Sequence, residues 1–221
     1  MSQPEISIVV LISGSGSNLQ AIIDATQNGI IPASIKAVIC NKENAFGLTR
    51  AANAGLVTEV VSHKNYDSRE QFDHALQATI DQYSPDLVVL AGFMRILTPE
   101  FVKHYSGRML NIHPSLLPKY RGLNTHQRAI DDREPEHGVT VHFVTEELDG
   151  GPNVLQAKVP ISDGESAESL AGKVLIQEHQ IYPRAIKWFA EGRLKMSANQ
   201  AILDQNTLPE SGKQHLDGAC S

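Results

Sequence analysis

The chain has 221 residues, 41% of them hydrophobic, which is enough for one large domain or two small ones with a buried core. This composition excludes a disordered or fibrous protein. With 19 basic and 25 acidic residues the formal net charge is −6, so no chain-wide positive field attracts nucleic acid or anionic lipid.

Strands and helices are predicted to alternate along most of the chain. Residues 6–12 (ISIVVLI) form a β-branched run typical of a parallel strand buried on both faces, and a helix is predicted from Ser17 to Gly29. Further strands are predicted at 35–40, 57–61, 87–91 and 108–112, and further helices at 45–54, 68–83 and 125–132. This alternation predicts one α/β domain with a mostly parallel, doubly wound, Rossmann-like sheet and helices on both faces.

The last third of the chain departs from this regular alternation. Strands are predicted at 139–144 and 154–159, and an antiparallel strand is expected near this end of the sheet. A long helix is predicted from Glu165 to Gly192, interrupted at Pro183. From about Met196 the sequence is polar and rich in Asn, Gln and Ser, which predicts a loosely packed tail over residues 197–221 after a single domain over residues 1–196.

The cysteines and the N-terminus indicate a cytoplasmic protein. Two cysteines, Cys40 and Cys220, cannot form a disulfide scaffold and favour a reducing compartment. The first five residues carry an acid where a signal peptide has its basic stretch. Because no apolar run reaches the roughly 18 residues of a membrane span, we expect no membrane association.

A glycine-rich loop, SGSGSN at residues 13–18, lies between the first strand and the first helix. Backbone N–H groups at such a helix start are suited to binding a phosphate. The dinucleotide fingerprint is incomplete, since Leu19 replaces its third glycine and the second predicted strand ends at Cys40-Asn41 without the acidic residue that binds ribose. The loop also fits neither a Walker motif nor a nucleophile elbow. A flexible turn without a ligand is the alternative interpretation.

Three polar residues are expected at the carboxyl edge of the sheet, where open α/β sheets bind ligands. Asn111 and His113 end one predicted strand with their side chains on the same side, and Asp149 lies in the LDGGP loop. An amide donor, an imidazole and a carboxylate that orients it suit a reaction that passes through an oxyanion. Each also has a structural alternative: Asn111 as a loop cap, His113 packed before a proline, and Asp149 as a turn former.

Other candidate residues are less specific. The histidines at 126, 137 and 142 show no zinc-ligand spacing, so we expect no metal. The segment Met94–Leu97 has both an apolar and a cationic side, which suits a flat aromatic ligand or simple closure of the core. Arg69 is either a solvated helix charge or a clamp for a carboxylate.

Several strings resemble the folate-dependent formyltransferases, and in particular the phosphoribosylglycinamide formyltransferase family of de novo purine synthesis. They are GSGSN, GFMRIL, LNIHPSLLP and LDGGP, and the resemblance covers about residues 5 to 196. It implies a formyltransferase catalytic domain over 1–196 that moves the formyl group of 10-formyltetrahydrofolate, its co-substrate, to the amine of a phosphoribosylglycinamide. It also implies small-molecule partners only, no metal, no nucleic acid, and a monomer or weak homodimer.

The resemblance also implies roles for individual residues. The catalytic trio falls on Asn111, His113 and Asp149. The residues that match the family's ribonucleotide site are Gly16, Ser17, Asn18 and Glu178. The residues that match its folate site are Arg69, Met94, Arg95, Ile96, Leu97, Asn111, Glu146, Glu147, Leu148 and Asp149.

The sequence departs from the family pattern in places, and rival functions stay open. Arg121 and Asn124 stand where proline and histidine are expected, and Leu175 stands where a polar residue is expected, so the contribution of these positions to binding is open. Formyltetrahydrofolate hydrolases and tRNA formyltransferases share the trio, but we expect an extra domain in them. A nicotinamide-dependent oxidoreductase is disfavoured by the broken fingerprint, and a non-catalytic nucleotide-binding module has no use for the trio.

Overall fold

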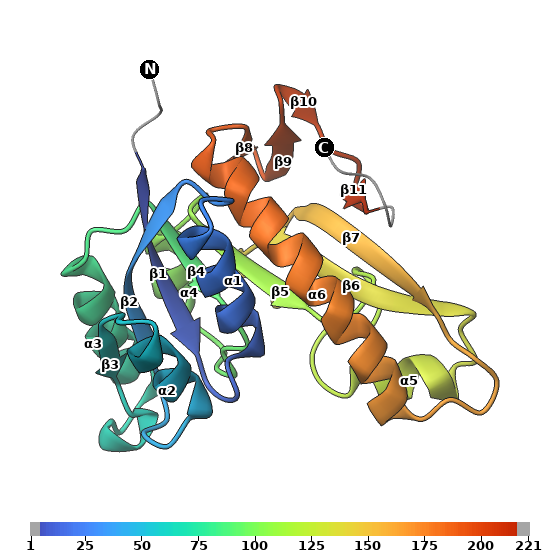
Figure 1. The fold of residues 1–221 in the computed structure, drawn as a ribbon, viewed down its shortest axis with the longest axis horizontal. Coiled ribbons are helices and arrows are strands. Elements are labelled where there is room, and N and C mark those ends of the chain that lie inside the picture. Colours follow the sequence, from blue (N-terminus) through green and yellow to red (C-terminus); the bar gives the residue numbers. More distant parts are fainter. Residues whose placement is uncertain (1–4, 216–221) are drawn as a thin grey trace.

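The structure is a computed structural model that describes residues 5–215, and it contains one large sheet and one small sheet (Figure 1). The large sheet has eight strands in the order β11-β7-β6-β5-β4-β1-β2-β3, and the small one has three in the order β10-β9-β8. Cys220 and the outermost parts of the predicted tail and N-terminus, residues 216–221 and 1–4, lie outside the described residues.

The strands of the large sheet are β1 (Ile6–Ile12), β2 (Ala33–Cys40), β3 (Thr58–Val60), β4 (Leu87–Leu90), β5 (Met109–His113), β6 (Glu136–Phe143), β7 (Asn153–Pro160) and β11 (Lys213–Gln214). Those of the small sheet are β8 (Leu194–Ser197), β9 (Gln200–Leu203) and β10 (Asn206–Thr207). The helices are α1 (Ser17–Gln27), α2 (Phe46–Asn53), α3 (Arg69–Asp81), α4 (Pro99–His104), α5 (Thr125–Asp131) and α6 (Ala167–Ala190), with a 3-10 turn at His63–Asn65.

Helices cover both faces of the large sheet. Because side chains alternate along a strand, Ile8, Val10 and Ile12 of β1 point to one face, and Val9 and Leu11 point to the other. The first face packs against α1 and α6, and the second packs against α3 and α4. All five side chains are fully buried, which explains the uninterrupted apolar run. The predicted doubly wound α/β fold is confirmed.

The chain reverses its direction across the sheet between β1 and β4. Strands β2 and β3 follow β1 on one side, whereas β4 and β5 lie on the other, and all of them are parallel. The loops after β1 and β4 therefore diverge at the carboxyl edge, which is the usual ligand site of such sheets. The Met94 N–H donates to the Ser13 hydroxyl over 2.8 Å and ties the two loops together.

The predicted antiparallel part of the sheet is formed by β6, which pairs antiparallel with both β5 and β7. Its register places His142 opposite Asn111 and Thr140 opposite His113. The antiparallel pairing therefore brings a second strand alongside the two predicted catalytic positions on β5.

One prediction about the helices is wrong, and one helix was not predicted. Helix α6 is not interrupted at Pro183 but continues from Ala167 to Ala190. Pro183 is itself buried, and Tyr182 beside it donates its hydroxyl to the Leu90 and Leu110 carbonyls, so packing on the sheet outweighs the hydrogen bond that proline removes. The short helix α4 was missed, although Thr98 as its cap and Pro99 as its first residue are a typical helix start.

The expectation of loose packing after Met196 is wrong for the described residues up to 215. Strands β8, β9 and β10 form the small sheet, and β11 adds a parallel edge strand beside β7. Leu194, Ala201 and Leu203 are buried in the core cluster that includes Trp188. The alternation that buries them is short and lies among polar residues, and this is why composition alone suggested a tail.

Candidate active site

The glycine loop forms an open helix start at the carboxyl end of β1. Gly16 occupies the N-cap position of α1 at φ +71°, and because it has no side chain, the first N–H groups of the helix are not capped by it. A Cβ at Gly16 would lie 2.6 Å from the Gly47 Cα, and the Gly47 N–H donates to the Gly14 carbonyl over 3.0 Å. Close packing of two glycines therefore holds the loop in a shape that suits an anion.

Asn18, the last residue of this loop, meets Glu178 of α6. The Asn18 Nδ2 donates to the Glu178 Oε2 over 2.6 Å, and both side chains are buried. Burial raises the pKa of the Glu178 carboxyl, and the hydrogen bond from Asn18 opposes this shift. The structure thus brings together the four residues predicted for the ribonucleotide, which are Gly16, Ser17, Asn18 and Glu178.

The predicted catalytic trio also comes together. Asn111 and His113 lie on β5, and the Asp149 side chain reaches them from the loop after β6. The distance between His113 Nδ1 and Asp149 Oδ2 is 3.5 Å, and the two side chains are only 8% and 9% exposed. On the other side of the ring, His113 Nε2 lies 2.9 Å from the Tyr120 carbonyl oxygen. Since a carbonyl only accepts, Nε2 carries a hydrogen, and this bond turns Nδ1 toward the carboxylate.

His142, for which the sequence indicates neither a metal site nor a catalytic role, contacts Asn111 directly. Its Nδ1 lies 2.9 Å from the Phe143 carbonyl, so that nitrogen carries the hydrogen, and its Nε2 accepts from the Asn111 Nδ2 at 3.1 Å. Burial lowers the pKa of His142, which keeps the ring neutral and able to accept. His142 therefore fixes the orientation of the Asn111 amide. Its contact with Asn111 depends on the antiparallel register of β5 and β6, which the sequence does not specify.

Most of the residues predicted to bind folate lie on two loops, residues 94–97 after β4 and residues 146–149 after β6, whereas Asn111 lies on β5 and Arg69 begins α3. Met94, Ile96 and Leu148 are 61%, 57% and 51% exposed, which is unusual for large apolar side chains and suits a flat apolar ligand. Leu97 is half-buried, and Glu146 and Glu147 are exposed.

Arg69 and Arg95 both act on the buried Asp73. Burial raises the pKa of the Asp73 carboxyl, while hydrogen bonds from Thr98 and the two positive charges oppose the shift. Arg95 stacks over the Phe72 ring at 5.5 Å, whereas Arg69 is 44% exposed beside Glu70. The two predicted cations therefore lie in one region, at the start of α3 and the loop after β4.

Two of the remaining histidines have rings in contact, the half-buried His126 and the buried His137. The rings of His126 and His137 have centroids 5.1 Å apart, and burial lowers both pKa values, that of His137 to about 4. Within residues 5–215, no group of three or more His, Cys, Asp or Glu side chains has an arrangement that could hold a metal ion. The same part of the chain contains no helix whose length and apolar content would let it cross a bilayer.

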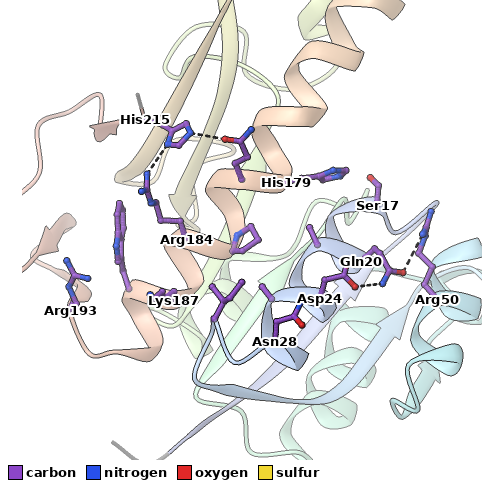
Figure 2. A pocket seen from close by; sticks show the side chains of 16 residues that line it. Ser17, Gln20, Asp24, Asn28, Arg50, His179, Arg184, Lys187, Arg193 and His215 are labelled. Carbon is purple, nitrogen blue, oxygen red and sulfur yellow. Dashed lines mark hydrogen bonds between the residues drawn. The ribbon is translucent and has the colours of Figure 1, made fainter. Parts of the chain in front are cut away.

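Two hollows differ in their relation to the trio. One of about 350 Å³ is lined by Asp149 and Arg121. A larger groove of about 840 Å³ contains none of the trio and lies between α1, α6 and the end of the described chain; Figure 2 shows Ser17 and Arg50 on one side of it and Arg184 and His215 on the other. Because none of the trio lines the larger groove, we do not assign the active site to it, although it has the greater volume.

Comparisons with known proteins found similar chains both by sequence and by structure. A family model described as formyl transferase matches residues 6–186. A phosphoribosylglycinamide formyltransferase of Escherichia coli K12 is 58% identical over 206 residues, which cover 93% of this chain and 97% of that protein.

Solved structures give the same result. The structure of a phosphoribosylglycinamide formyltransferase from Coxiella burnetii has a TM-score of 0.91 at 53% identity, and the match covers 95% of this chain and 99% of that one. Glycinamide ribonucleotide transformylase 1 from Symbiobacterium toebii has a TM-score of 0.88 at 44% identity over 91% of this chain and 95% of its own. These similarities extend over nearly the whole of each chain.

Proposed function

The chain belongs to the formyl transferase family, and on this premise we propose that it transfers the formyl group of 10-formyltetrahydrofolate to the amine of N1-(5-phospho-D-ribosyl)glycinamide in de novo purine synthesis. The observation that carries the proposal is the buried His113–Asp149 pair beside Asn111 at the carboxyl edge of the sheet. Relatives that share more than half of the residues of this chain carry the corresponding name.

The ribonucleotide is proposed to bind at the start of α1. Its phosphate accepts from the backbone N–H groups of Gly16, Ser17 and Asn18, where the positive end of the helix dipole also favours an anion. Glu178 contacts the ribose hydroxyls, because a carboxyl is a strong acceptor for hydroxyl donors. The direct hydrogen bond between Asn18 and Glu178 supports this, since it joins the last residue of the glycine-rich loop to the Glu178 carboxyl.

The folate is proposed to lie across Met94, Arg95, Ile96 and Leu97 on one side and the loop of Glu146, Glu147, Leu148 and Asp149 on the other. The exposed apolar side chains in both segments would be covered by its ring system. Arg69 and Arg95 supply positive charge for the carboxylates of its glutamate tail.

In the proposed reaction the glycinamide amine attacks the formyl carbon directly and forms a tetrahedral intermediate. The Asn111 amide and the imidazolium of His113 donate hydrogen bonds to the oxyanion, while Asp149 holds His113 and positions a water. That water carries the proton from the attacking amine to N10 of folate, the bond from carbon to N10 breaks, and tetrahydrofolate leaves. Oxyanion donors of this kind are typically worth about 2.7–4 kcal/mol each.

The cellular location, the partners and the oligomeric state are part of the same proposal. We propose a cytoplasmic enzyme that acts on small molecules and binds neither nucleic acid nor membrane, as a monomer or weak homodimer. The buried free thiol of Cys40 is consistent with a reducing compartment, and no metal is needed for the proposed chemistry.

The test is to mix the protein with 10-formyltetrahydrofolate and to follow its deformylation with and without the ribonucleotide. A transferase deformylates folate only when the ribonucleotide is present. Turnover that is independent of the ribonucleotide would instead indicate a hydrolase. No turnover with the ribonucleotide but turnover with methionyl-tRNA would indicate the tRNA branch of the family.

A further inference from the structure

A short turn at residues 120–122 touches both members of the catalytic pair. The Tyr120 carbonyl accepts from His113 Nε2 over 2.9 Å, and the Gly122 N–H donates to Asp149 Oδ2 over 2.9 Å. Oδ2 is the same oxygen that faces His113 Nδ1. The position of this turn therefore sets both the rotation of the imidazole and the place of the carboxylate.

Arg121 lies at the centre of this turn and joins it to the loop that carries Asp149. Its guanidinium forms an ion pair with the carboxylate of Glu147, two residues before Asp149. A Cβ at Gly150 would lie 2.4 Å from the Glu147 side chain, so the glycine makes room for the folded-back position of that carboxylate. The Glu147 carbonyl also accepts from the Gly150 N–H over 3.0 Å. The loop is thus shaped so that Glu147 can meet Arg121.

The turn is also tied to α5. The Arg128 Nη1 donates to the Arg121 carbonyl over 2.7 Å, and the Arg128 guanidinium lies 5.2 Å from the centre of the Tyr120 ring. The backbone carbonyl of Arg121 is therefore bonded to α5, and its side chain is bonded to the loop that carries Asp149. A shift of the turn would alter both catalytic contacts together.

From these contacts we propose that Arg121 is a positioning residue for formyl transfer, acting through the turn and Glu147 on the His113–Asp149 pair. The proposal rests on the function proposed above. Because the side chains of Arg121 and Glu147 are 38% and 65% exposed, the ion pair is of the partly solvated kind, and we expect about a two- to five-fold effect on kcat. The KM for the ribonucleotide stays unchanged, since its proposed site on α1 does not contact the turn.

The test compares wild type with Arg121→Ala, Glu147→Gln, the double variant that carries both of these changes, and the charge exchange Arg121→Glu with Glu147→Arg. Glu147 is also a proposed folate contact, so the informative quantity is the coupling between the two positions in kcat rather than either single effect. Lys158→Ala is the matched control, because it removes a similarly exposed ion pair, with Glu136, on β6 and β7. We expect Arg121→Ala to lower kcat, the exchange to recover at least half of the loss, and Lys158→Ala to behave as wild type.

A second readout does not depend on activity. Hydrogen exchange of the Gly122 amide, measured by NMR on the substrate-free protein, should be about two- to five-fold faster in Arg121→Ala and unchanged in Lys158→Ala. Two results for Arg121→Ala would each overturn the proposal: an unchanged kcat, or an unchanged rate of hydrogen exchange at the Gly122 amide. A charge-exchange variant that recovers none of the lost kcat would also overturn it. If the wild type itself fails to transfer the formyl group to the ribonucleotide, the proposed function is wrong. The hydrogen-exchange measurement at Gly122 would still decide whether Arg121 holds the turn in place.

Discussion

At the scale of single residues, His113 faces an acceptor at each ring nitrogen, the Tyr120 carbonyl at Nε2 and the Asp149 carboxylate at Nδ1. An imidazole ring that carries a hydrogen on each nitrogen can donate to both of these acceptors. This is also the form of the ring that can stabilise an oxyanion. The 3.5 Å separation on the Asp149 side is longer than an ordinary hydrogen bond. The Nδ1 hydrogen is therefore held only weakly by the carboxylate, and an oxyanion that approaches in the plane of the ring can share it.

Asp149→Asn should lower kcat by about 100-fold or more, because the neutral amide neither balances the imidazolium nor activates the relay water. The protein should stay folded, since an asparagine oxygen can still accept from the Gly122 N–H. Steady-state kinetics and circular dichroism measure the two properties. Asp163→Asn, at an exposed turn, is the control, and turnover of Asp149→Asn near that of wild type would remove the proposed role of the carboxylate.

His142→Ala should lower kcat by about five- to ten-fold, since the Asn111 amide loses the acceptor that orients it and one hydrogen bond is worth about 1 kcal/mol. The exposed His74 on α3 provides the matched control, His74→Ala. Steady-state rates at saturating substrates measure the effect. Equal kcat values for the two variants would show that Asn111 needs no partner.

At the scale of elements, the site depends on how the ends of strands and helices meet. The contact between Gly16 and Gly47 holds the start of α1, and α6 contributes Glu178 to that region. The register of β5 and β6 and the turn at 120–122 hold the trio. Residues from several separate elements and loops thus converge on one edge of the sheet. This is the behaviour expected where an α/β sheet reverses its strand order.

Gly16→Ala should lower the free energy of unfolding by about 1–3 kcal/mol, because it adds a Cβ at positive φ against the Gly47 backbone. Gly29→Ala is a sharp control: its φ is +69°, nearly the same, but nothing lies within 4 Å of the added Cβ. Urea denaturation of both variants separates backbone strain from the clash. A loss for Gly16→Ala no greater than that for Gly29→Ala would show that the close approach of the two glycines is not important.

At the scale of the whole molecule, features that follow from the periodicity of the sequence could be predicted, whereas features that depend on the register of paired strands could not. Buried strands such as Ile6–Ile12 and the position of Asn111 and His113 at a strand end could be predicted, because they follow from local pattern. The contacts of His142 and of the turn at 120–122 could not, because they join segments whose pairing the sequence does not specify. The small C-terminal sheet was missed because its strands have four residues or fewer.

The buried histidines should make the folded state less stable in mild acid. Burial lowers the pKa of His137 to about 4 and also lowers those of His126 and His142 from the ordinary value of 6.5. The unfolded chain then binds more protons as pH falls below about 6.5, so stability is lost in that direction. For His137 alone the loss between pH 8 and pH 5 is about 2 kcal/mol. Urea midpoints measured across this range should fall, and His137→Leu should weaken the dependence; a pH dependence equal to that of wild type would contradict this assignment.

The central claim is that this protein moves a formyl group from folate to the glycinamide amine, and following the carbon tests it most directly. The measurement supplies 10-formyltetrahydrofolate with a ¹³C-labelled formyl group together with the ribonucleotide, and analyses the products by mass spectrometry. The account predicts that the label appears in the N-formyl group of the ribonucleotide in an amount equal to the tetrahydrofolate formed. Label found instead as free formate, with the ribonucleotide unchanged, would contradict it.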